Sequence, residues 1–312
     1  MAVLLALPIY LLGLIPAMQP VKDPRKFLFA QEDFSRFHYA IIGDSVFCSY
    51  CVDSDSETMW AQFEKLTRYP CFPAALNGAT IADMMDAAGY LSGKMPSGST
   101  VFVGLIPTRF VGKGIVRHRN YFQEFDSLKI MERSSFTSVS LHDLSNFLFK
   151  GFLLYDEPYA LEKFLRKRKG NYDTGYKVWY DLGREKALRK FNSFVSSQTD
   201  KEVYIDTVAI DNIRNTLAER EITAVFVLSG LNFELIKSFS NGINPEELIA
   251  KLNNAHTRLV DYFDSTGYEY IDLYNSIDSD CFVDLVHINT CGDAEMAQAF
   301  ADFATQSSQK ER

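Results

Sequence analysis

Short apolar runs rich in Val, Ile, Phe and Tyr alternate with segments of helical periodicity along much of this chain. Strands of a parallel sheet are buried on both faces and read as continuous apolar runs, so the alternation predicts a parallel sheet covered by helices. The expected fold class is α/β, a three-layer α/β/α sandwich with a mostly parallel sheet and a helical insertion. The expected strands are residues 37–42, 71–76, 100–105, 223–228 and 268–273.

Amphipathic periodicity predicts helices between and after these strands. The segment 55–66 opens with capping residues and gathers four apolar residues on one side, Met59, Trp60, Phe63 and Leu66. The segment 245–264, which Gly267 ends, spaces its apolar residues by four and three: Leu248, Leu252, Ala255, Leu259 and Phe263. Residues 293–303 begin with an acidic turn after Gly292 and are expected to form the closing helix.

The alternation stops between about residues 109 and 198, where Lys-rich and Tyr-rich pieces contain no convincing strand. We expect one domain, residues 35–306, with a largely helical insertion at about 110–198 that covers the active site. The basic run Lys163–Tyr172 in this insertion is typical of a solvated helix face, and it is also compatible with an anionic polymer or a membrane surface.

Residues 1–20 carry no charged side chain and are followed by Lys22, Asp23, Arg25 and Lys26. This length is at the low end of the roughly 17 to 25 residues that span a bilayer. Basic residues before the apolar run and a clean Ala-x-Ala site are both missing, so we expect an uncleaved membrane anchor rather than a secretory signal. The basic cluster that follows leaves the orientation of this anchor open.

Composition narrows the classes of function. The 312 residues are 47% hydrophobic and carry a net charge of −8, so the chain can bury a full core but lacks the basic surface that nucleic acids require. Five cysteines cannot all pair within one chain. Cys48 and Cys51 have the spacing of a redox motif, but they follow a tight turn where small apolar residues pack, so we expect them in the core. No Cys and His residues show zinc-site spacing, and we expect no structural metal.

Two segments carry candidate chemistry. Gly43-Asp44-Ser45 follows an apolar strand, at the sheet edge where open α/β folds build their sites, and Gly43 would permit a tight turn. Near the other end, Asp284 precedes His287 by three residues, so one turn can deliver a base and the carboxylate that orients it. A serine hydroxyl needs such a base before it becomes a good nucleophile. Together they predict a Ser45, His287 and Asp284 catalytic set.

These motifs resemble those of the SGNH (GDSL-like) hydrolase superfamily, over roughly residues 37–106 and 222–304. Gly43-Asp44-Ser45 is similar to its first block, Leu76-Asn77-Gly78-Ala79-Thr80 to its second, and Asp284 with His287 to its fifth. The resemblance implies an SGNH/flavodoxin-like fold, oxyanion donors at the Ser45 and Gly78 N–H groups, and no metal or organic cofactor. The third block departs from the pattern, because Gly104 to Arg109 lacks the usual Asn. Asn77, Thr108 and Arg109 are the candidates for its replacement, and Asn232, after the fourth strand, is a candidate for a substrate contact or for a turn.

Because the third block lacks its Asn and the N-terminus is apolar, the chain resembles the membrane-anchored branch of the superfamily more than its soluble lipases. This branch includes DltD and the SGNH-like proteins of polysaccharide O-acetylation. This resemblance implies a serine esterase or acyltransferase outside the cytoplasm. Its substrate would be an acylated glycan, another cell-envelope polymer or a small ester, and its partner a membrane-bound O-acyltransferase. The alternative is a non-catalytic SGNH-like module that binds a glycan or docks on such a membrane protein. A plain carboxylesterase is the nearest enzymatic alternative.

Overall fold

The computed structural model describes residues 33–52, 54–76, 79–111, 202–238 and 244–310. Apart from Asp33, these residues belong to one compact unit, Phe34–Arg117 with Gly175–Arg312. The predicted anchor at residues 1–20 and nearly all of the predicted insertion at about 110–198 lie outside the described residues. Both therefore stay predictions.

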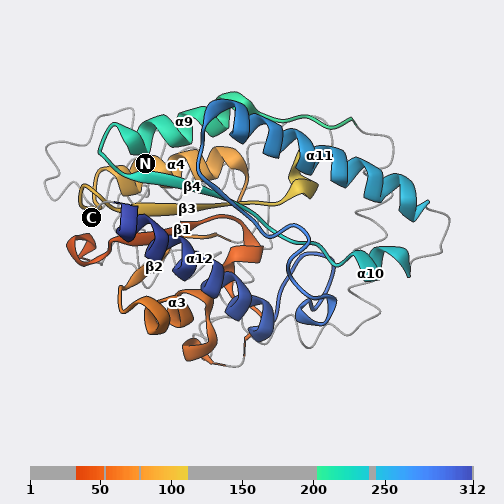
Figure 1. Ribbon diagram of the computed structural model, residues 1–312, viewed down its shortest axis with the longest axis horizontal. Coiled ribbons are helices and arrows are strands. Elements are labelled where there is room, and N and C mark those ends of the chain that lie inside the picture. Colours follow the sequence, from red (N-terminus) through yellow and green to blue (C-terminus); the bar gives the residue numbers. More distant parts are fainter. Residues whose placement is uncertain (1–32, 53, 77–78, 112–201, 239–243, 311–312) are drawn as a thin grey trace, which may run out of the picture. The chain divides into compact units, whose positions relative to one another are not determined.

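Five parallel strands form one sheet: β1 (Tyr39–Ile42), β2 (Cys71–Pro73), β3 (Thr100–Leu105), β4 (Thr223–Leu228) and β5 (Tyr270–Asp272). Their order in the sheet is β2-β1-β3-β4-β5 (Figure 1). All lie where the apolar runs predict strands, and β3 and β4 have the predicted bounds. The other strands are shorter, because each apolar run continues into a turn or loop at one or both ends.

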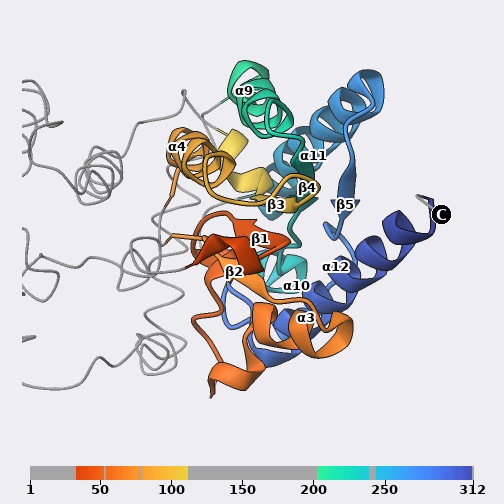
Figure 2. The ribbon, with the colours of Figure 1, turned by 90° about the vertical axis from the view of Figure 1, so that its left-hand side faces the viewer.

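Helices cover both faces of this sheet, as Figure 2 shows in a view along its edge. One face carries α3 (Met59–Thr67) and α12 (Thr290–Lys310), which pack against each other. The other carries α4 (Ile81–Ser92), α9 (Thr207–Ala218) and α11 (Pro245–Thr266). The predicted three-layer α/β/α arrangement is therefore confirmed. Short elements connect the layers: α10 (Phe233–Lys237) and the 3₁₀ helices η2 (Phe34–Arg36), η3 (Ser45–Cys48), η4 (Asp55–Glu57), η5 (Pro107–Phe110) and η9 (Ser279–Cys281).

Aromatic side chains fill the core on both sides of the two central strands. Phe102 of β3 stacks on Phe300 of α12 with 4.4 Å between ring centroids, on the face that also holds Phe63. Phe226 of β4 stacks on Phe263 of α11 at 4.9 Å. Alternate residues of a strand point to opposite faces, and Phe226 is in register with Val103 rather than with Phe102, so the two stacks lie on opposite faces. Both helical layers are thereby fixed to the sheet.

The helix predictions are confirmed in part. The five apolar residues predicted for α11 are all buried, and Gly267 ends the helix with φ +68. The predicted helix 55–66 is divided at Thr58, which caps α3, and Leu66 is 49% exposed rather than buried. Helix α12 begins before the predicted residue 293, at Thr290, because the Asn289 side chain accepts the Cys291 N–H. Helices α4, α9 and α10 were not predicted.

The strand order fixes where a site can form. In a sheet ordered 2-1-3-4-5 the strand order reverses at β1, because β2 is added on one side of it and β3 on the other. Ligand sites of open α/β sheets lie beyond the carboxyl ends of the strands, between the two strands where this reversal occurs. The segments that leave β1 and β3 at this edge are η3, which begins with Ser45, and η5, which contains Thr108 and Arg109. In the described part of the chain, no helix is both long enough and apolar enough to cross a bilayer.

Candidate active site

Ser45 is the first residue of η3, directly after the turn that leaves β1. Asp44 caps this short helix and shapes the turn, since its Oδ1 accepts the Val46 N–H at 3.1 Å. The first N–H groups of a helix have no acceptor within the helix. The Ser45 N–H is therefore available to a negative charge that develops beside the serine hydroxyl.

The ring of Phe47 fixes η3 against the sheet. Phe47 is fully buried, and a Cβ atom added at Gly43 or Gly104 would lie 2.7 or 2.3 Å from its Cδ2 atom. Gly43 has no positive φ, so the turn does not need glycine for its backbone conformation. The close approach of the Phe47 ring, rather than an unusual backbone conformation, requires glycine at both positions.

His287 and Asp284 meet Ser45 from the far end of the chain. The Nε2 atom of His287 lies 2.9 Å from the Ser45 Oγ, across 242 residues of sequence. Its Nδ1 atom lies 2.7 Å from Asp284 Oδ2. The carboxylate can only accept at Nδ1, so Nδ1 carries the proton and Nε2 is left to accept the serine hydroxyl. The three residues thus form one hydrogen-bonded chain with the order of a serine-nucleophile triad.

The environment of Asp284 keeps it ionised. Burial raises the pKa of this carboxyl. The side-chain hydrogen bond with His287, the positive charge of His287 when its ring is protonated, and the backbone N–H groups of His287 and Val286 outweigh that effect, so the net pKa lies below its ordinary value. The two N–H groups donate to Asp284 Oδ1 at 2.8 and 2.9 Å. The second oxygen is then directed at the imidazole, which it orients.

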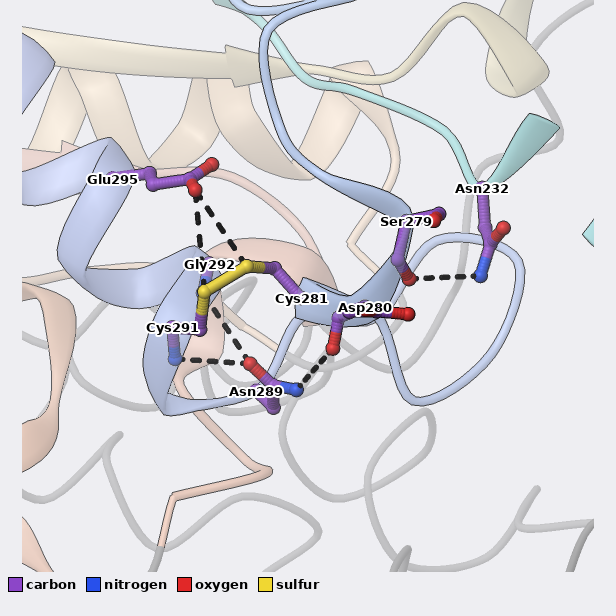
Figure 3. Close-up of a disulfide and its surroundings, with 8 residues drawn as sticks. All are labelled: Asn232, Ser279, Asp280, Cys281, Asn289, Cys291, Gly292 and Glu295. Atoms are coloured by element: carbon purple, nitrogen blue, oxygen red, sulfur yellow. Dashed lines mark hydrogen bonds between the residues drawn. A yellow bond between two sulfur atoms is a disulfide. The ribbon is translucent and has the colours of Figure 1, made fainter. Parts of the chain in front are cut away.

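A disulfide closes the loop that carries Asp284 and His287. Cys281 and Cys291 are joined across ten positions, with 5.1 Å between their Cα atoms (Figure 3). The Asn289 side chain links the two ends, accepting the Cys291 N–H and donating to the Asp280 carbonyl at 2.9 Å. Sequence reasoning missed this pairing, although both cysteines flank the Asp284 and His287 motif.

Gly292 lets the first turn of α12 approach this loop. A Cβ atom at this position would lie 2.6 Å from the Cβ of Ile288 and 3.0 Å from the Cys281 carbonyl oxygen. Phe282 and Ile288 also form an antiparallel bridge across the loop. The absence of a side chain at Gly292 therefore helps to hold His287 beside Ser45.

Asn232, which precedes α10, stabilises the same loop. Its side chain caps α10 by accepting the Leu235 N–H at 2.9 Å and donates to the Ser279 carbonyl at 3.3 Å, as Figure 3 shows in part. Its own N–H donates to the Leu285 carbonyl, between Asp284 and His287. These contacts favour the turn interpretation of Asn232 over a substrate contact.

Of the three residues predicted to replace the third-block Asn, the structure describes Thr108 and Arg109. Thr108 and Arg109 lie in η5, Thr108 buried and the Arg109 side chain 46% exposed. The Arg109 guanidinium donates from Nε and Nη2 to Asp44 Oδ2, at 3.0 and 2.8 Å, a contact that sequence reasoning missed. Asn77 and Gly78 lie outside the described residues, and their roles stay predictions.

Cys48 and Cys51 form no disulfide and are buried, as expected for core residues. Burial, followed by the negative charges of Asp284 and Asp293, raises the pKa of Cys51 to about 12. A thiol with such a pKa stays protonated near neutral pH and is a poor nucleophile. Among the described residues, Cys281, Cys291 and Glu295 lie close enough together to hold an ion, but the disulfide removes the two thiolates that a metal needs.

Comparison with known proteins identifies no family. No family model and no curated protein matches the chain. A crystal structure of a Bacteroides fragilis protein described as a "putative acylhydrolase" aligns with 95% of this chain and 97% of its own, at 11% sequence identity and a TM-score of 0.40. A likeness this distant assigns neither a family nor an activity.

Proposed function

We propose that this chain is a serine-dependent enzyme that cleaves or transfers acyl esters. The observation that carries the proposal is the hydrogen-bonded chain Ser45 Oγ, His287 Nε2, His287 Nδ1, Asp284 Oδ2. It is supported by the place of Ser45 at a helix start beyond the carboxyl end of a central strand, where the N–H of the helix start can stabilise an oxyanion.

Each group has a role in the proposed reaction. The Ser45 Oγ attacks the acyl carbon while its proton passes to His287 Nε2, and the resulting oxyanion accepts the Ser45 N–H. The tetrahedral intermediate collapses as the bond from the acyl carbon to the leaving oxygen breaks, and that oxygen takes the proton from His287. Water or an acceptor hydroxyl then loses a proton to His287 and attacks the acyl carbon. The bond between the acyl carbon and Ser45 Oγ breaks, and Oγ takes the proton back from His287. Asp284 stabilises the imidazolium each time it forms.

Hydrolysis of p-nitrophenyl acetate and of longer acyl esters tests this proposal. Ser45→Ala and His287→Ala are expected to lose activity by roughly 10³-fold or more, since the serine and histidine of a triad act as a unit. A suitable control is Ser279→Ala, which alters a loop serine whose carbonyl, not hydroxyl, contacts Asn232. Undiminished hydrolysis by the folded Ser45→Ala variant would refute the serine mechanism.

The finer proposal concerns the substrate. We infer an O-acetyl or aminoacyl ester of a cell-envelope glycan, handled by a membrane-anchored protein beside a membrane-bound O-acyltransferase. Its support is the sequence resemblance in Ser45, Asp284 and His287 together with the apolar residues 1–20. Faster turnover of acetyl than of longer acyl esters, and recovery of the full-length chain in the membrane fraction, are the expected results. A preference for long acyl chains, or a chain found only in the soluble fraction, would contradict it.

A further inference from the structure

Asp44 places a buried carboxylate directly beside the proposed nucleophile. The residue is 1% exposed and precedes Ser45 in the turn after β1. One of its oxygens is used by the Val46 N–H, and the other accepts two N–H groups of Arg109. A buried charge is tolerated when it is paired and hydrogen-bonded, and Asp44 meets both conditions.

The charge on Asp44 matters for the chemistry because the reaction creates a second negative charge nearby. The oxyanion of the tetrahedral intermediate forms on the acyl group bound to Ser45, within one residue of this carboxylate. Two like charges about 6 Å apart in a partly buried environment repel each other by roughly 2 to 3 kcal/mol. An unpaired Asp44 would therefore raise the energy of the transition state more than that of the bound substrate.

Arg109 is placed to cancel this charge. It lies in η5 after β3, which pairs with β1, so the ion pair joins the two loops that leave the sheet where its strand order reverses. Two N–H donors converge on one carboxylate oxygen, which fixes the orientation of the carboxylate more firmly than a single donor would. About half of the Arg109 side chain is exposed, so water solvates the outer part of the guanidinium.

We propose that Arg109 is a positioning residue for the acyl-transfer reaction, acting through Asp44: it neutralises and orients the carboxylate that caps the Ser45 helix, so that this carboxylate does not oppose the oxyanion. The inference rests on the proposed function. Arg109 thereby contributes to oxyanion stabilisation without contacting the oxyanion, in a chain whose third block lacks the usual Asn.

Removing either charge or both tests this role. Arg109→Gln leaves Asp44 unpaired, and kcat and the rate of reaction with a fluorophosphonate are expected to fall on the order of 10- to 100-fold, with KM little changed. The double variant Asp44→Asn with Arg109→Gln carries neither charge and is expected to react at least about 5-fold faster than Arg109→Gln alone. Arg109→Lys, which keeps the charge, should lose less than Arg109→Gln.

Arg220→Gln is the matched control, because it removes the same charge from an exposed position near the amino end of β4, at the opposite edge of the sheet. It should leave the rates unchanged. An effect of Arg109 that does not pass through Asp44 predicts that the two losses add. A double variant slower than Arg109→Gln would therefore overturn the proposal, as would an Arg109→Gln variant with wild-type kcat.

If Arg109→Gln does not fold, the comparison of Asp44→Asn with the double variant decides. Loss of Arg109 in the Asp44→Asn background should change kcat by less than about 3-fold, and a loss above 10-fold overturns the proposal. Ser45→Ala separates the two levels of inference. If the wild-type protein reacts through Ser45 but the charge variants behave additively, only the role of Arg109 is refuted. If the wild-type protein does not react, the proposed function is refuted and this inference with it.

Discussion

Gly104 occupies a position where the fold leaves no room for a side chain. A Cβ atom here would lie 2.3 Å from two atoms of the buried Phe47 ring, which belongs to the same short helix as Ser45. Forced overpacking of a core typically destabilises a protein by about 1 to 3 kcal/mol. Displacement of Phe47 would also move the proposed nucleophile away from His287.

Gly104→Ala is therefore expected to lower the free energy of unfolding by about 1 to 3 kcal/mol and to reduce kcat/KM at least 10-fold, measured by urea denaturation and ester hydrolysis. Gly89→Ala is the matched control, because Gly89 is exposed within α4 and has nothing within 4 Å of an added Cβ. It should stabilise the helix by up to about 1 kcal/mol and leave activity unchanged. Equal effects of the two substitutions would contradict the role assigned to Phe47.

Asp284 links stability to pH. Its pKa in the folded protein is lowered, so its ionised form contributes stability above the pKa of the unfolded chain, about 4, and this contribution disappears as the pH falls through the folded pKa. The difference in unfolding free energy between wild type and Asp284→Asn should thus be larger at pH 5 than at pH 3. Urea denaturation at several pH values measures it.

Asp280→Asn serves as the control for this prediction, because Asp280 is an exposed acid of the same loop. Asp280→Asn should change the free energy of unfolding by less than about 0.5 kcal/mol, as exposed substitutions usually do. A difference between wild type and Asp284→Asn that persists undiminished at pH 3 would show that Asp284 is not held as a carboxylate by His287 and the backbone.

At the scale of elements, the loop between η9 and α12 is constrained by a disulfide between Cys281 and Cys291. Closing a loop of about ten residues removes unfolded-state entropy worth roughly 2 to 3 kcal/mol. Replacing both cysteines by serine should lower the unfolding free energy by about that amount. It should also lower kcat, since His287 would be held less firmly beside Ser45.

A dithiol reductant should produce the same loss of stability in the wild type and none in the double serine variant. Thiol titration supplies the independent check. Three of the five cysteines form no disulfide, so the unfolded protein should show three thiols before reduction and five after it. A count of five without reductant would contradict the disulfide.

Elements with a strong local signal are those that the sequence predicted best. Helix α11 carries a regular apolar stripe and a terminal Gly267, and its buried face agrees with the prediction in every residue. The same periodicity failed for Leu66, because a periodic stripe identifies the face of a helix but not how far along it the partner helix extends. Helix α12 was predicted too short, since the Asn289 cap depends on how the preceding loop is folded.

At the scale of the whole molecule, the sequence predicted the candidate catalytic residues and their order along the chain. It did not predict the contacts that hold them in place. Ser45 and the pair Asp284 and His287 stand in recognisable motifs, and the structure brings them within hydrogen-bonding distance. The contact between Arg109 and Asp44 spans 65 positions, and the exclusion of a side chain at Gly104 depends on Phe47. Neither has a local signature, because each arises from the pairing of β1 with β3.

The central claim is that Ser45 is a nucleophile activated by His287. The most direct measurement is peptide mapping by mass spectrometry after reaction of the native chain with a fluorophosphonate, alongside Ser45→Ala and His287→Ala. The account predicts one adduct, on the peptide that contains Ser45, absent from Ser45→Ala and formed at least roughly 10³-fold more slowly in His287→Ala. An adduct on a different residue, or no adduct on well-folded wild-type protein, would contradict it.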